Sequence, residues 1–123
     1  MEVFHGIAEA KGLAGGALVL GNFDGVHVGH QALFRVAAGF GRVAAFTFQP
    51  HPGKVLQPEL APKLVTTLER KLELLAEAEV AAVVLQPFTR EYARTSPEAF
   101  EASVLDALAV RHVVVGMDFT YRR

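Results

Sequence analysis

Residues 17–30 read ALVLGNFDGVHVGH, a short apolar run followed by a segment with three glycines and two histidines. The run 17–20 has the length and composition of a buried strand, and the glycines at 21, 25 and 29 prevent its simple continuation. The residues after His30 predict a helix that Gly39 and Gly41 end. The stretch therefore predicts a strand, a glycine-rich turn and a helix, the opening unit of an α/β fold. The inward face of this helix is expected to carry Leu33, Phe34, Val36 and Ala37.

The rest of the chain continues the alternation of strands and helices. Apolar runs rich in β-branched residues predict further strands over 43–48, 80–85 and 110–115. Between the first two of these runs, residues 49–65 contain four prolines and one glycine. A connection of that length and composition favours a functional loop over a tight turn.

Two more helices are expected, each with a recognisable start. Thr66 and Glu69 have the spacing of a capping box and open a helix that continues to about residue 78. Ser96 and Pro97 supply an N-cap and a proline at the first helical position of the next helix. The inward faces are expected to carry Leu68, Leu72 and Leu75 in the first helix, and Phe100, Val104, Leu105 and Leu108 in the second.

This order of elements predicts one doubly wound parallel sheet. Alternating strands and helices imply right-handed crossovers, with helices on both faces of the sheet. If the strand order is 3-2-1-4, the loops after the first and fourth strands meet where the order reverses, and ligands bind at that point. Those two loops contain residues 21–30 and 116–121, so we expect the ligand crevice between them.

Composition limits the classes of protein that the sequence can encode. A chain of 123 residues, 51% hydrophobic and 20% charged, is expected to fold as one domain over 1–123. The formal net charge of −1 gives no reason to expect a nucleic-acid or membrane partner. The absence of cysteine excludes disulfides, thiolate nucleophiles and cysteine-based metal sites. Without a leader-like or membrane-spanning stretch, we expect a cytoplasmic protein.

The glycine-rich segment favours phosphate binding. It matches neither the dinucleotide fingerprint nor the Walker loop, which ends in Gly-Lys-Ser/Thr. His27 and His30 are three residues apart, so both imidazoles can face one ligand at the start of a helix. That helix start also supplies unpaired N–H donors, and Gly29 leaves room for a phosphate. The alternatives are a turn with locally bonded histidines and a pair of metal ligands that lacks a third.

Residues 21–30 resemble the signature of the FMN adenylyltransferase module of the bacterial bifunctional riboflavin kinase/FAD synthetase family. The resemblance extends to residues 46–52 (FTFQPHP), 64–75 and 113–119, and so covers nearly the whole chain. It implies a Rossmann-like nucleotidyltransferase fold that is incomplete at its C-terminal end, without a riboflavin kinase domain. In the full-length protein such a kinase domain would be a partner of this one.

The resemblance also implies a reaction and a role for individual residues. AMP would be transferred from ATP to FMN, giving FAD and pyrophosphate, with His27 and His30 as the catalytic residues. Mg²⁺ would be held by phosphate and water more than by dedicated protein ligands. Asp24 would lie on the flavin side and near the phosphates. The remaining binding residues would be Gly21, Asn22, Phe23, Gly29 and Asp118 for ATP, and Phe48 and His51 for the flavin.

Other interpretations of the same residues stay open. His51 can be a rigid loop residue between two prolines, Phe48 a core aromatic and Asp118 a turn cap. The glycine- and arginine-rich loop and the later Ser-Ser/Thr-x-x-Arg segment of the family do not occur in this sequence. The alternative functions are therefore another nucleotidyltransferase of the His-x-Gly-His type, or a nucleotide or flavin binder without catalysis.

Overall fold

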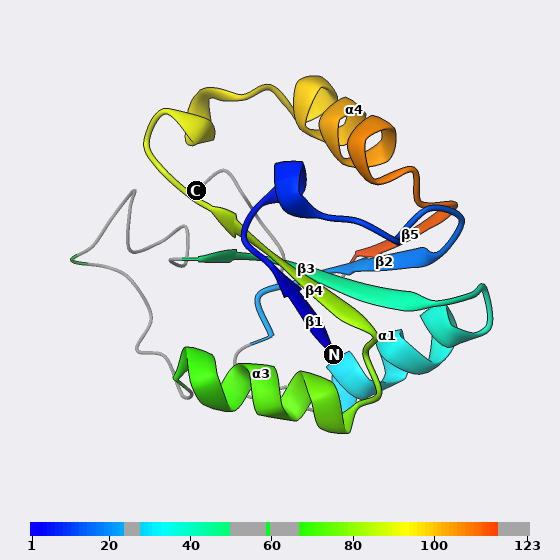
Figure 1. The fold of residues 1–123 in the computed structure, drawn as a ribbon. Coiled ribbons are helices and arrows are strands. Elements are labelled where there is room, and N and C mark those ends of the chain that lie inside the picture. The colour runs from blue at the N-terminus through cyan, green and yellow to red at the C-terminus, as the bar shows by residue number, and fades with distance from the viewer. Residues whose placement is uncertain (24–27, 50–58, 60–66, 116–123) are drawn as a thin grey trace.

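The computed structural model describes residues 1–23, 28–49, 59 and 67–115, and for residues 28–30 it describes the backbone alone. Within these described residues, five strands form one sheet, and three α-helices and two short 3-10 helices connect and cover them (Figure 1). The strands are β1 (Glu2–Phe4), β2 (Ala17–Leu20), β3 (Val43–Gln49), β4 (Ala82–Pro87) and β5 (His112–Val115). The helices are α1 (Val28–Ala38), α3 (Leu68–Glu77), α4 (Pro97–Leu108), η1 (Ile7–Glu9) and η2 (Tyr92–Arg94).

The sheet is parallel throughout and has the order β1-β4-β3-β2-β5. The doubly wound parallel sheet is confirmed, and the four strands expected from the sequence occur in the 3-2-1-4 order that places the loops after the first and fourth strands together. The sequence did not reveal β1, which pairs with β4 at one edge, Glu2 opposite Ala82. A strand of three residues is too short to show a period, and its partner is about 80 residues away in the chain.

Helices cover both faces of the sheet, as expected. In Figure 1, α1 and α3 lie below the sheet, and α4 and η1 lie above it. Two clusters of buried apolar residues fill the two interfaces. The cluster between the sheet and helices α1 and α3 includes Phe23, Phe34 and Leu75. The cluster between the sheet and α4 includes Phe46 and Phe48.

Two of the predicted inward positions are wrong. Val36 on α1 is 55% exposed and Leu105 on α4 is 47% exposed. At 3.6 residues per turn, each lies roughly 100° from the centre of the buried stripe of its helix, at the border between core and solvent. The neighbouring predictions are confirmed, because Phe34, Ala37, Phe100, Val104 and Leu108 are buried.

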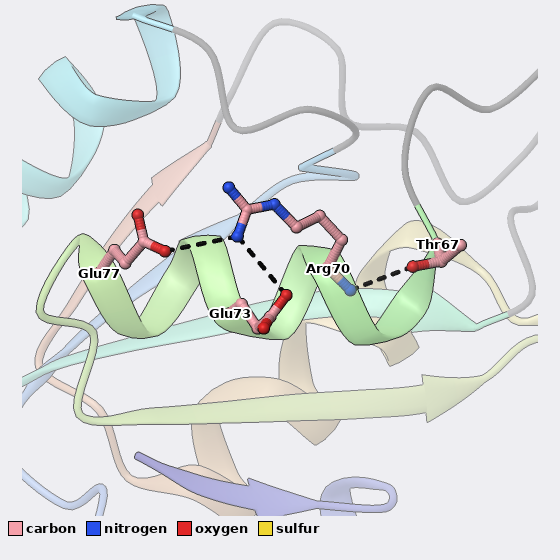
Figure 2. A network of polar contacts seen from close by, with 4 residues as sticks. All are labelled: Thr67, Arg70, Glu73 and Glu77. Atoms are coloured by element: carbon pink, nitrogen blue, oxygen red, sulfur yellow. Dashed lines mark hydrogen bonds and ion pairs between the residues drawn. The ribbon is translucent and has the colours of Figure 1, made fainter.

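The start of α3 also differs from the prediction. The N-cap is Thr67, whose hydroxyl accepts a hydrogen bond from Arg70 N at 3.1 Å (Figure 2). The expected capping box of Thr66 and Glu69 is therefore wrong by one residue, and Arg70 occupies the position that a box would give to Glu or Gln. The expected cap of α4 is confirmed, since the Ser96 hydroxyl accepts from Ala99 N at 3.1 Å.

The observed ends of several elements differ from the predicted ends by one or two residues. Helix α1 begins at Val28, before His30, which brings Gly29 and His30 into its first turn. Strand β5 begins at His112, two residues later than expected, because Ala109 ends α4 in the left-handed conformation with φ of 52°. Among the described residues, no helix is long and apolar enough to cross a membrane.

The cap at Thr67 gives a direct test of where α3 starts. Replacing Thr67 with Ala removes the acceptor for Arg70 N and is expected to lower the free energy of unfolding by about 1 kcal/mol. Thr67→Ser keeps the hydroxyl and should stay within a few tenths of the wild-type value. Urea denaturation followed by circular dichroism measures both. Equal stabilities of Thr67→Ala and the wild type would rule out this cap.

Candidate functional site

The carboxyl edge of the sheet has a step where the strand order reverses. Strands β2 and β5 end side by side, with Leu20 paired to Val115 and, on the other side, to Phe46. Strands β3 and β4 continue as a pair to Gln49 and Pro87. At about 3.3 Å per residue, β3 extends roughly 10 Å beyond the end of β2. The carboxyl ends of the strands at the reversal point are where α/β sheets of this type bind ligands.

The segment that follows β2 is fastened along β3. Gly21 N donates to Phe46 O at 3.1 Å, and the Thr47 hydroxyl donates to Asn22 O at 3.4 Å. Thr47 is fully buried, and Asn22 is 8% exposed. The backbone of Gly21 and Asn22 is therefore fixed against β3, just beyond the end of β2, by one main-chain and one side-chain hydrogen bond.

Phe23 closes the turn by folding its ring back over Gly21. A Cβ atom at Gly21 would lie 2.8 Å from Cε1 of Phe23, closer than real Cβ atoms come. Phe23 has a positive φ of 56°, which is uncommon for a residue other than glycine. Its fully buried ring packs against Phe34 of α1, with the ring centroids 5.4 Å apart. The Phe23 side chain is thus part of the core, and only its backbone can face a ligand.

Of the two histidines of the motif, the structure describes the backbone of His30 only. His30 and Gly29 belong to the first turn of α1. The first N–H groups of a helix have no partner within it and carry a partial positive charge, so this backbone suits an anion. His27 precedes the helix and lies outside the described residues, as do Asp24, His51 and Asp118.

Phe48 lies at the centre of an aromatic cluster beneath α4. It is 1% exposed, and its ring contacts the rings of Phe88, Phe46, Tyr92 and Phe100. The centroid distances are 5.0 Å to Phe88, 5.5 Å to Phe46, 5.7 Å to Tyr92 and 6.0 Å to Phe100. The expectation that most of the Phe48 surface is core is confirmed. The cluster packs the carboxyl ends of β3 and β4 against the core.

A groove of about 400 Å³ lies at the opposite edge of the sheet. It is lined by α1 from Gln31 to Ala38, the end of α3 and the start of β3, and its charged residues are Arg35, Glu77 and Glu79. Two carboxylates disfavour a polyanion such as ATP. The groove is also at the amino ends of the strands, away from the point where such sheets bind ligands. We therefore assign the candidate site to the stepped carboxyl edge.

The sequence reasoning missed one buried charged residue. Lys71 on α3 is 7% exposed and is the one buried residue with a formal charge among those that the structure describes. A signal was available: Leu68, Lys71, Leu72 and Leu75 have the spacing i, i+3, i+4 and i+7 of a buried helical stripe. The described residues contain no group of three or more His, Cys, Asp or Glu that could hold a metal ion.

The parallel sheet and the glycine turn at its reversal point define a Rossmann-like nucleotidyltransferase fold. This fold is shared with pantothenate synthetase from Thermus thermophilus, with a TM-score of 0.52 and 27% identity over 81% of this chain and 36% of that one. A crystal structure titled macrolide-efflux protein from Streptococcus pneumoniae has the same fold, with a TM-score of 0.79 over 98% of this chain and 43% of that one, at 24% identity.

The chain belongs to the FAD synthetase family, whose model matches residues 10–123. It is 40% identical to a bifunctional riboflavin kinase/FMN adenylyltransferase of Listeria monocytogenes, over 85% of this chain and 35% of that protein. It is 35% identical to an FAD synthetase of the same organism, over 98% of this chain and 52% of that protein. The chain thus spans between about a third and a half of the length of these relatives.

The contact between Gly21 and Phe23 can be tested by a single methyl group. Gly21→Ala forces the buried Phe23 ring to move, and we expect the free energy of unfolding to fall by about 1–3 kcal/mol. Gly39→Ala is the matched control, because its Cβ would meet only Val36 O, at 3.4 Å. Thermal and urea unfolding of both variants make the comparison. Equal stability of the two variants would contradict the close packing at Gly21.

Proposed function

We propose that this chain is part of a domain that transfers AMP from ATP to FMN. An oxygen of the FMN phosphate attacks the α-phosphorus of ATP in line, a new P–O bond forms, and the bond to the β-phosphate breaks. The products are FAD and pyrophosphate, with no covalent enzyme intermediate. The family match over residues 10–123 carries the proposal, and the close-packed turn of Gly21–Phe23 at the stepped edge supports it.

The proposed catalytic residues are His27 and His30. Phosphoryl-type transfer requires little covalent chemistry from the protein, so the main tasks are positioning and stabilisation of charge on the phosphate oxygens. Imidazole N–H groups beside the N-terminus of α1 suit that role, because the helix adds backbone donors to those of the side chains. Neither histidine is proposed as a base or a nucleophile.

The proposed binding residues divide between the two substrates. Gly21, Asn22, Phe23, Gly29 and Asp118 form the ATP side. Since the Phe23 ring is buried, its contribution to ATP binding is the shape of the turn and its backbone. Phe48, His51 and Asp24 form the flavin side. The Phe48 ring is part of the aromatic cluster, so its contribution is to support this side of the site by packing.

Two further proposals concern the metal and the partner domain. Mg²⁺ would neutralise the triphosphate and be held mainly by phosphate oxygens and water, as this ion generally prefers. A riboflavin kinase domain would accompany this one in the full-length protein, by analogy with the bifunctional riboflavin kinase/FMN adenylyltransferase of Listeria monocytogenes.

The test of catalysis is formation of FAD from ATP, FMN and Mg²⁺. His27→Ala and His30→Ala are each expected to lower turnover by about 100-fold or more, while the dissociation constant for ATP changes by only a few-fold. Chromatographic detection of FAD measures turnover, and calorimetry measures ATP and FMN binding.

The alternative is a nucleotide or flavin binder without catalysis. That alternative predicts that the wild type forms no FAD and that the histidine variants lose only affinity for ATP. Binding of both ATP and FMN with no formation of FAD would overturn the proposed transferase. Preference for another phosphate acceptor over FMN, in a competition assay, would instead indicate a related transferase.

A further inference from the structure

Thr47 is a polar residue inside a strand that is otherwise apolar and buried. Residues 43–48 of β3 read VAAFTF, and all of them are buried. Thr47 itself has no exposed surface. A valine has nearly the same shape and suits such a position, without a hydroxyl that has to be removed from water. Packing alone therefore does not account for the hydroxyl of Thr47.

The Thr47 hydroxyl joins β3 to the turn after β2. Regular pairing of the two strands ends where Leu20 lies opposite Phe46, and Gly21 N adds one main-chain bond to Phe46 O at 3.1 Å. The Thr47 hydroxyl then donates to Asn22 O at 3.4 Å, across 25 residues of sequence. It thus extends the contact between the turn and β3 one residue beyond that main-chain bond.

A hydrogen bond to Asn22 O orients a whole peptide group, because a peptide group is planar and almost always trans. The carbonyl of Asn22 and the N–H of Phe23 belong to the same plane and point in opposite directions. With the oxygen directed at Thr47, the N–H of Phe23 is directed away from it. Phe23 has a φ of 56°, a conformation that a residue other than glycine keeps only where its surroundings hold it. The Thr47 hydroxyl is one of the groups that hold it.

Burial protects this hydrogen bond from competition with water. Thr47 and Phe23 are fully buried, and Asn22 is 8% exposed. Because solvent does not readily reach the contact, water cannot take the place of a missing hydroxyl. Without the hydroxyl, the turn of Gly21–Phe23 loses one of the contacts that orient it on its way to the start of α1 at Val28.

We infer that Thr47 is a positioning residue of the nucleotide site, whose hydroxyl orients the peptide group between Asn22 and Phe23. The inference rests on the proposed function, which assigns this turn to the ATP side of the site. Thr47 touches no substrate, since its side chain is enclosed in the core. It acts on the affinity for ATP through the backbone of the turn.

The test separates the hydroxyl of Thr47 from its volume. Thr47→Val keeps the branched shape and removes the donor, so we expect the dissociation constant for ATP to rise about fivefold to tenfold. The dissociation constant for FMN should change by less than about twofold, since other residues form the flavin side. Thr47→Ser keeps the donor and removes a methyl group, and should bind ATP within about twofold of the wild type although it is less stable. Calorimetry measures the affinities, and thermal unfolding measures the stabilities.

Val43→Ala is the matched control for a general loss of stability. Val43 lies at the other end of β3, on the same face of the sheet as Thr47, and is 8% exposed. Truncation to alanine leaves a cavity in the core and is expected to lower the melting temperature at least as much as either Thr47 variant. Its affinity for ATP should nevertheless stay within about twofold of the wild type, because the turn keeps its hydrogen bond.

The possible results separate the inference from the proposed function. Unchanged ATP affinity in Thr47→Val overturns the role of Thr47, while FAD formation by the wild type still supports the transferase. Equal losses in Thr47→Val and Thr47→Ser overturn it as well, since they indicate packing and not the hydroxyl. An equal loss in Val43→Ala also overturns it, because any destabilisation would then weaken binding. If Thr47→Val does not fold, Thr47→Ala is compared with Thr47→Ser by the same criteria. A wild-type chain that does not bind ATP overturns both the inference and the proposed function.

Discussion

The packing of the Phe23 ring against the Cα of Gly21 is the contact on which the candidate site depends. Strand β2 lies between β3 and β5, so the direction in which the chain leaves it decides what occupies the reversal point of the sheet. The ring excludes any side chain at residue 21, and its contact with Phe34 connects the turn to α1. The N-terminus of α1 therefore follows a turn that is fixed at the carboxyl edge, and the proposed phosphate binding uses both features.

The sequence predicted the parts of the fold that have a clear period or a strong local signal. Four strands, their order and three helices are confirmed, because buried strands and amphipathic helices repeat over enough residues to be recognised. Strand β1 was missed because three residues show no period, and its pairing with β4 is tertiary. The cap of α3 was assigned to Thr66, since two adjacent threonines leave the register of the first turn undecided until Thr67 is seen to accept from Arg70 N.

The motif of the candidate site was predictable from the sequence, but the buried residues that hold it in place were less so. The glycines and histidines of residues 21–30 indicate phosphate binding without any structure. The burial of Phe23 and Lys71 follows from three-dimensional packing, and a positive φ at a phenylalanine has no sequence signature. The roles of the individual site residues remain predictions. The buried polar residues Asn22 and Thr47 lie at the carboxyl edge of the sheet, and carboxylates line the groove at the amino edge.

The central claim is that the nucleotide binds at the carboxyl edge, beside the turn after β2. Amide chemical-shift mapping during titration with ATP and Mg²⁺ tests this location most directly. The account predicts that the largest saturable shifts cluster at Gly21, Asn22 and Phe23 and in the first turn of α1. Residues of the amino-edge groove, such as Arg35 and Glu79, should change little. Largest shifts in that groove, or no saturable shifts at the turn, would contradict the account.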